Sequence, residues 1–139
     1  MTNKIEVSWK GGMLFESVAP EGSILIEASE EVGGTGVGLR PKAMMLTSLA
    51  GCTAMDVASL LKKMRAEVTD FKIDVEGELT EEHPKFYYKV KVIYKFYDKE
   101  FQKDKIEKAV NLSVERYCGV MEMFRKFSEV TTEIIYIQQ

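Results

Sequence analysis

The run LTSLAGCTAMDV, residues 46–57, is the part of this 139-residue chain that decides its fold. It contains one charged residue, Asp56, and lies within a longer stretch that begins at Pro41 and reaches Ala66. Proline is tolerated in a first helical turn, and cations near a C-terminal end suit the helix dipole. We therefore expect one long helix from Pro41 to Ala66, about 39 Å long at 1.5 Å per residue. Because its first half is apolar nearly all round, burial on several sides is expected, partly by a second copy of the chain.

The composition excludes several classes of function. With 45% hydrophobic residues, 29% charged residues and a net charge of −3, the chain is typical of a soluble domain without a basic nucleic-acid surface. The opening Met-Thr-Asn-Lys-Ile-Glu carries no apolar signal region, so a cytoplasmic location with reduced thiols is expected. Residues 43–61 approach the length of a membrane span, but their Ser, Thr and Gly content favours a buried helix. No membrane association is predicted, and the length indicates a single domain over residues 1–139.

The N-terminal third has the pattern of short strands. Ile5, Val7 and Trp9 alternate with polar residues, and Gly11-Gly12 and residues 20–22 offer tight turns, which together predict a β-meander. The following glycines, between residues 33 and 38, match neither the dinucleotide fingerprint nor the phosphate-binding loop. We interpret them as a mobile segment that leads into the central helix.

A long hairpin follows the central helix. Apolar residues alternate with charged ones over residues 71–79 and 86–96, on either side of a polar turn at 80–84. Folding about that turn predicts a cross-strand arrangement with Glu76 near Lys89 and Asp74 near Lys91. Helical spacing then covers residues 104–117, with a break at Gly119, a short helical piece at 120–127 and a closing strand at 131–137. Without regular βαβ alternation, this order predicts an α+β fold.

Catalytic chemistry is restricted by the side chains that the chain lacks. His83 is the single histidine and lies in a turn, so a Ser-His-Asp triad, a Cys-His pair and a histidine-rich metal site are excluded. There is no Cys-x-x-Cys motif. Cys52 and Cys118 remain. One thiol can reduce a peroxide and the other can resolve the sulfenic acid to a disulfide, or both can be buried core residues. Spacing alone leaves both readings open.

The surroundings of the cysteines suggest further roles. Asp56 follows Cys52 by one helical turn, and a carboxylate there disfavours a thiolate. We therefore expect Asp56 to hold a backbone group or an arginine. Methionines near both cysteines, including Met55 and Met121, could line an apolar pocket or fill the core.

Two motifs resemble the OsmC/Ohr family and lie closest to its YhfA-like branch. They are LAGCTAMDV around Cys52, preceded by a glycine-rich segment and Pro41, and RYCGV around Cys118. The order of elements matches over nearly the whole chain. The resemblance implies an intertwined α+β homodimer with two sites at the subunit interface. It also implies reduction of organic hydroperoxides in an oxidative stress response, with Cys52 as peroxidatic and Cys118 as resolving thiol. A dithiol reductant, such as a lipoyl group, regenerates the family's enzymes without a bound cofactor.

Two positions depart from the family pattern. Family members carry an arginine near the first hairpin, where this chain has Lys10, and a glutamate after the helix-opening proline, where it has Lys42. Lys10 or Arg40 are candidates for the positive charge that favours a thiolate. The leading hypothesis is a thiol-dependent peroxidase that uses Cys52 and Cys118. The alternative is a non-catalytic dimeric module that binds an apolar small molecule.

Overall fold

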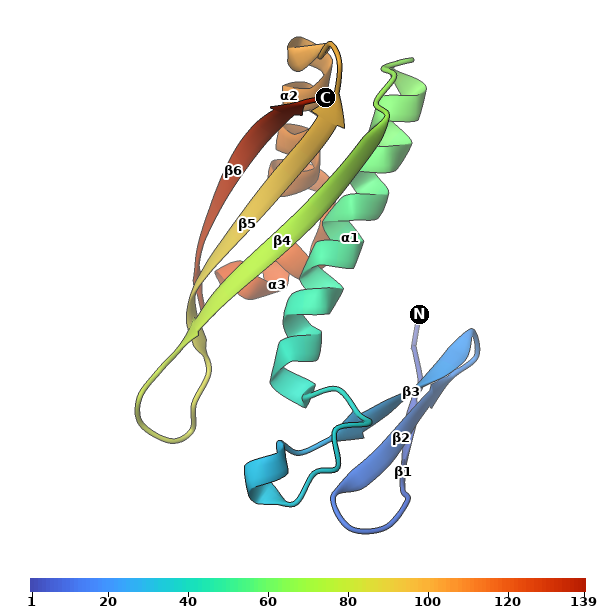
Figure 1. Cartoon of the computed structure of the whole chain (residues 1–139), viewed down its shortest axis with the longest axis vertical. Helices are drawn as coiled ribbons and strands as arrows, with labels where there is room; N and C mark the ends of the chain where they lie inside the picture. The colour runs from blue at the N-terminus through green and yellow to red at the C-terminus, as the bar shows by residue number, and fades with distance from the viewer. The chain divides into compact units, whose positions relative to one another are not determined.

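The structure, a computed structural model, describes residues 1–139 and has the predicted α+β composition (Figure 1). The chain forms two compact units, Met1–Met45 and Leu46–Gln139. Each unit contains one three-stranded sheet, and the long helix α1 (Pro41–Lys63) begins in the first unit and continues in the second.

The N-terminal unit is the predicted meander. Strands β1 (Glu6–Trp9), β2 (Leu14–Ala19) and β3 (Gly22–Glu27) pair antiparallel in chain order. The first turn needs glycine because Gly11 and Gly12 have φ angles of 104° and 55°, in the left-handed region. Unlike an independent domain, this unit buries no large apolar side chain, and Trp9 at its edge is 68% exposed. The meander therefore lacks an apolar core of its own.

The glycine-rich segment is held around a buried carboxylate, Glu27. After the short 3₁₀ turn η1 (Glu30–Val32), the Thr35 hydroxyl donates to Glu27 at 2.8 Å. The backbone N–H groups of Val37 and Gly38 donate to it at 3.1 and 3.3 Å. These bonds, led by the one from Thr35, lower the pKa of Glu27 to about 2. The expected mobile segment is thus anchored, by a residue that lies outside the glycine run.

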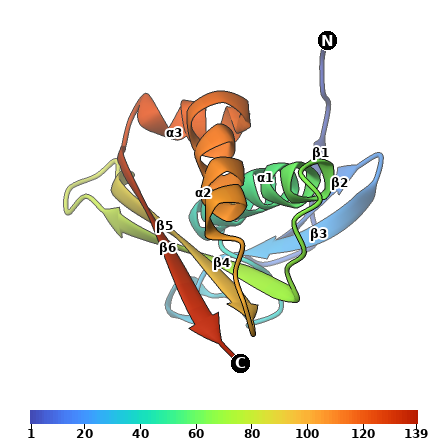
Figure 2. The same cartoon turned by 90° about the horizontal axis from the view of Figure 1, so that it is seen from above.

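The C-terminal unit packs helices on one face of its sheet (Figures 1 and 2). Strand β4 (Asp70–Leu79) pairs antiparallel with β5 (Tyr87–Asp98), and β6 (Glu129–Gln138) pairs parallel with β5. Helices α2 (Lys103–Leu112) and α3 (Gly119–Arg125) connect β5 to β6. The helices and the inward side of β5 form the core, which includes Leu49, Val57, Tyr94, Phe96, Ile106, Val110, Met121 and Phe124.

The predicted hairpin forms, but the predicted cross-strand pairs were wrong. Glu76 lies opposite Lys91, and Glu78 lies opposite Lys89, two residues from the expected register. A β-bulge near the loop leaves Tyr88 without a partner, so Tyr87 rather than Tyr88 points into the core. The bulge adds one residue that alternation alone does not reveal. The solitary histidine is exposed in the connecting loop, as expected.

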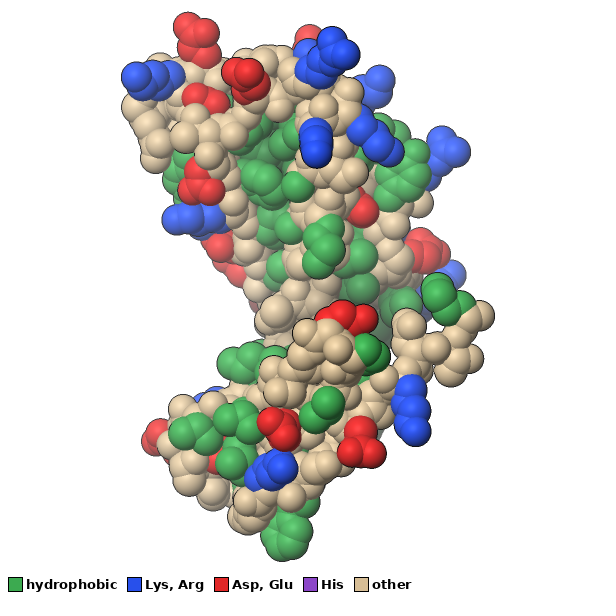
Figure 3. All heavy atoms as spheres, turned by 90° about the vertical axis from the view of Figure 1, so that its right-hand side faces the viewer, with side chains coloured by type: hydrophobic (Ala, Val, Ile, Leu, Met, Phe, Trp, Pro, Cys, Tyr) green, Lys and Arg blue, Asp and Glu red, His purple; other side chains and the backbone are tan.

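Helix α1 ends at Lys63, three residues earlier than predicted, because Arg65 adopts a left-handed φ of 53°. Its buried residues are spaced four apart, at Leu49, Thr53, Val57 and Leu61, and form a single stripe. Within one chain, the expected burial of α1 on several sides does not occur. Hydrophobic side chains are exposed on the side of the molecule where α1 lies (Figure 3). By length and composition α1 could span a membrane, a test that the core helix of a soluble protein also passes.

The predicted break beside Cys118 is confirmed in modified form. Helix α2 is followed directly by one π-helical turn, η2 (Ser113–Tyr117), so the chain stays helical up to Tyr117. That turn closes with a hydrogen bond from the Cys118 N–H to the Ser113 carbonyl at 2.9 Å. Cys118 is extended, and Gly119 is already the first residue of α3. The break therefore falls at the cysteine itself, next to a π-helical turn, a feature that is frequent at functional sites.

Candidate thiol site

The structure brings the two cysteines together. Cys52 lies half-buried in α1, Cys118 is 4% exposed between η2 and α3, and both are free thiols that lie near each other, closely enough for their ionisations to interact. Burial raises the pKa of Cys118 to about 12, and the neighbouring thiol of Cys52 and the carboxylate of Asp56 act in the same direction. The N–H of Met121 donates to the Cys118 sulfur at 3.4 Å and opposes this shift. Cys118 is thus held as a neutral thiol against its partner.

A chain of polar side chains lies beside the thiols. The Thr53 hydroxyl is 2.7 Å from the Tyr94 hydroxyl and 2.7 Å from the Ser113 hydroxyl, and Ser113 donates to Asp56 at 2.9 Å. Thr53, Tyr94 and Ser113 have no exposed surface. Burial raises the pKa of Tyr94 to about 12, and the charges of Cys118 and Asp56 add to that rise. These hydrogen-bonded side chains link α1, β5 and η2 beside the thiols.

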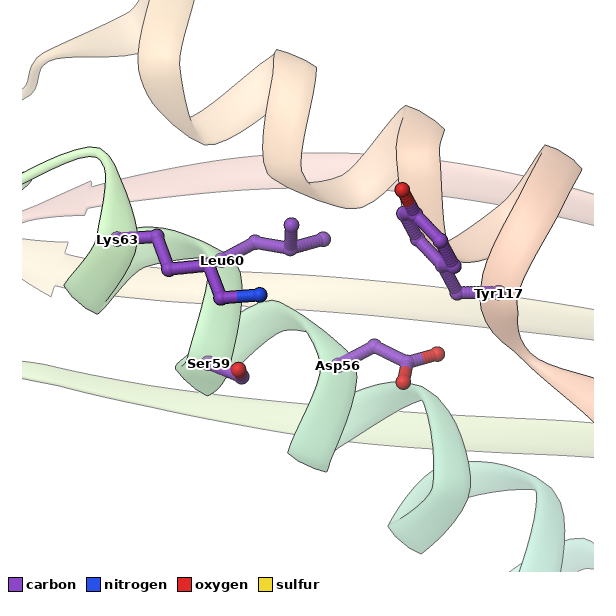
Figure 4. A pocket seen from close by; sticks show the side chains of 5 residues that line it. All are labelled: Asp56, Ser59, Leu60, Lys63 and Tyr117. Atoms are coloured by element: carbon purple, nitrogen blue, oxygen red, sulfur yellow. The ribbon is translucent and has the colours of Figure 1, made fainter.

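Asp56 has neither of the partners that the sequence suggested. Instead of a backbone group or an arginine, it binds the hydroxyl of Ser113. It also lines a pocket of about 300 Å³ with Ser59, Leu60 and Lys63 of α1 and Tyr117 of η2 (Figure 4). The carboxylate therefore lies between the buried polar chain and an open pocket.

A second pocket, of about 280 Å³, is lined by residues 114–119, Glu122 and Arg125, and shares Tyr117 with the first. Arg125 donates to the Val114 carbonyl and, at 3.3 Å, to Glu122. Its charge lowers the pKa of Tyr94, opposing the larger effect of burial, so it acts on the site electrostatically. The sequence reading missed this cation, which ends α3, the helix that begins directly after Cys118.

The other residues predicted for the site have partners of their own. Lys10 pairs with Glu16 at 3.6 Å, and Arg40 donates to the Gly38 carbonyl at 3.0 Å, both within the N-terminal unit. Met121 is fully buried beside Cys118, whereas Met55 is 73% exposed on α1. Their roles in thiolate stabilisation or substrate binding remain predictions.

The members of the polar chain also escaped sequence analysis. Thr53 interrupts the apolar stripe of α1 between Leu49 and Val57, and Ser113 follows an apolar helical face. A hydroxyl on a buried stripe needs a partner, which was the available signal. The identity of that partner depends on how helices and sheet pack, which the pattern does not give.

Comparisons with known proteins agree with this architecture. A model of the OsmC family, described as OsmC-like protein, matches residues 33–133. Protein YhfA from Escherichia coli K12 is 32% identical over 91 residues, which cover 66% of this chain and 68% of YhfA. The chain belongs to the OsmC-like protein family, as its two cysteine motifs indicated.

Solved structures show the same fold. A hypothetical protein from Aquifex aeolicus VF5 superposes with a TM-score of 0.87 at 28% identity, covering 100% of this chain and 98% of that one. The organic hydroperoxide resistance protein OhrB of Bacillus subtilis superposes with a TM-score of 0.67 at 19% identity, covering 96% and 98%. The expected OsmC/Ohr fold is therefore confirmed.

Proposed function

We propose that this protein is a cytoplasmic, homodimeric peroxidase that reduces organic hydroperoxides through Cys52 and Cys118. The Cys52 thiolate attacks the terminal peroxide oxygen, the O–O bond breaks, and the alkoxide takes up a proton and leaves as the alcohol. Cys52 is then a sulfenic acid. The sulfur of Cys118 attacks the sulfur of Cys52, a disulfide forms, and water leaves. An external dithiol, for example a lipoyl group, reduces the disulfide and is itself oxidised.

The proximity of the two thiols is the observation that carries this proposal. It supports a scheme in which Cys118 reacts with a sulfenic acid formed on Cys52. The difference between the two cysteines supports the assignment of roles. A thiol whose pKa is raised to about 12 is a poor first nucleophile, because the thiolate is the reactive form. Cys118 therefore suits the resolving role, and the more exposed Cys52 suits the peroxidatic role.

Access to the pair supports the same scheme. Cys118 lines the pocket beside η2, from which a reducing dithiol can approach the disulfide. Arg125 adds positive charge to that pocket. Lys10 and Arg40 remain the candidates for thiolate stabilisation that the sequence suggested. No bound cofactor is required, because the electrons come from the external dithiol.

Exposed apolar surface supports the homodimer. The N-terminal meander has no apolar core, and its side chains such as Trp9 and Val7 are 68% and 50% exposed. Large exposed apolar surfaces mark interaction sites. A second copy that covers them and the outer face of α1 would make one functional domain of both units, with a site at each interface. Sedimentation equilibrium is expected to give twice the 15.8 kDa mass of the chain.

The test of the proposed function is consumption of cumene hydroperoxide with dihydrolipoamide as reductant. Wild-type protein is expected to turn over, and Cys52→Ser to lose activity. Cys118→Ser is the matched variant: it should react once and leave a sulfenic acid that dimedone traps. Consumption by Cys52→Ser at the wild-type rate would contradict the proposal. A dimer with no thiol chemistry would favour the non-catalytic module that binds an apolar small molecule.

A further inference from the structure

The pocket between α1 and η2 is built on one face of the long helix. Its α1 residues are spaced as i, i+3, i+4 and i+7, and they are Asp56, Ser59, Leu60 and Lys63. Tyr117 of η2 faces them across the pocket (Figure 4). With a volume of about 300 Å³, the cavity lies at the lower limit for small-molecule pockets, so it suits a small ligand.

The two ends of this helical face carry opposite charges that do not neutralise each other. No salt bridge of the structure includes Asp56 or Lys63. Residues two turns apart are separated by about 10.5 Å along a helix, whereas direct ion pairs form one turn apart. The Lys63 side chain extends back along α1 toward Asp56, but the two groups remain separate (Figure 4). The pocket therefore contains an unpaired carboxylate and an unpaired ammonium group.

The carboxylate is oriented before any ligand arrives. The buried hydroxyl of Ser113 donates to Oδ2 of Asp56 at 2.9 Å and holds the side chain in place. Oδ1 of Asp56 accepts no hydrogen bond from the protein, and the Lys63 ammonium donates none. Between these two groups, the Leu60 side chain and the Tyr117 ring provide apolar surface. The pocket thus offers an acceptor at one end, a donor at the other and an apolar wall between them.

We propose that this pocket binds an apolar α-amino acid. The ammonium group of the ligand donates to Oδ1 of Asp56, and its carboxylate accepts from the ammonium of Lys63. The ligand's side chain lies against Leu60 and Tyr117. A ligand with a single charge leaves one end of the pocket unpaired, whereas a zwitterion forms a charge-assisted hydrogen bond at both ends. The proposal is independent of the peroxidase cycle, because neither cysteine takes part in it.

The experiment is an NMR titration of the full-length protein, in which amide chemical shifts give both the affinity and the location of the ligand. The probe is L-leucine. Two matched compounds each carry half of its charge: isoamylamine lacks the carboxylate, and 4-methylpentanoate lacks the amine. L-Leucine is expected to shift the amides of residues 56–63 and of Tyr117. It should bind about tenfold more tightly than either half, because each half loses one charge-assisted hydrogen bond.

Two variants should separate the ends of the pocket. Asp56→Asn still accepts from Ser113 but has no charge, so it should weaken L-leucine and isoamylamine about tenfold and leave 4-methylpentanoate unweakened. Lys63→Met should weaken L-leucine and 4-methylpentanoate about tenfold and leave isoamylamine unweakened. Lys62→Met is the matched control, because Lys62 is the neighbouring exposed lysine and lines a different pocket. It should change none of the three affinities.

Three results would overturn the proposal: no amide shifts at millimolar L-leucine, L-leucine binding no tighter than its two halves, or wild-type affinity for L-leucine in Lys63→Met. The Lys63 side chain makes no ion pair or hydrogen bond, so Lys63→Met should fold as wild type and decides the matter even if Asp56→Asn unfolds. Circular dichroism spectra check the folding of each variant. None of these results bears on the peroxidase proposal, which its own thiol assays test.

Discussion

Replacing Thr53 by valine tests the packing of the site most severely, because the two side chains have nearly the same shape. The hydroxyl of Thr53 is the only link between Tyr94 and Ser113, and all three residues have no exposed surface. Valine leaves the Tyr94 donor and one Ser113 acceptor unsatisfied in the core. Each such group costs about 1–3 kcal/mol, so the expected loss of folding free energy is about 3 kcal/mol.

That loss converts to a measurable shift in melting temperature. At about 2.1 cal/mol/K per residue, a chain of this length unfolds with an entropy of about 0.3 kcal/mol/K, so the shift is about 10 °C. Thermal and urea denaturation of the reduced protein, followed by circular dichroism at one protein concentration, would measure it. Thr53→Ser keeps the hydroxyl and should lose far less. A Thr53→Val protein that melts within about 2 °C of wild type would refute the reasoning, because each kcal/mol corresponds to a shift of about 3 °C.

Two further predictions concern stability. The pKa of Glu27 is lowered to about 2 from 4.5, so its stabilising effect is complete above pH 4.5 and is lost as the pH falls toward 2. Melting curves over that range should show a smaller acid-induced decrease for Glu27→Gln than for wild type, and equal slopes would contradict this assignment. Gly77→Ala would place a Cβ 2.6 Å from the Tyr87 ring and should cost about 1–3 kcal/mol in urea denaturation. At Gly119 an added Cβ meets no atom within 4 Å, so Gly119→Ala should leave the urea midpoint near that of wild type, and equal midpoints for both variants would refute the packing argument.

Much of the fold could be predicted because local patterns determine it. Strict alternation in residues 71–79 and 86–96 requires two half-buried strands, and Gly11-Gly12 requires a turn. The bulge at Tyr88 accounts for one of the two residues by which the predicted register was wrong, and it depends on which tyrosine packs against Gly77, a tertiary contact. The early end of α1 has the same origin, since nothing in the local sequence forces Arg65 into a left-handed conformation.

The sequence analysis identified the two cysteines of the candidate site but not the hydrogen-bonded hydroxyl groups beside them. Cys52 and Cys118 stand in distinctive motifs, so their meeting followed from the family resemblance. The partner of Asp56 did not, because Ser113 lies 57 residues away and reaches it only through the packing of η2 on α1. Long-range hydrogen bonds of this kind leave no periodic signal in a sequence.

The central claim is that Cys52 and Cys118 form a disulfide when the protein reduces an organic hydroperoxide. Intact mass and thiol titration of the reduced protein, before and after one equivalent of cumene hydroperoxide, test it most directly. The account predicts the loss of two hydrogens and of both thiols per chain, and no such loss in either Cys→Ser variant. Two thiols that persist unchanged in the wild-type protein would contradict it.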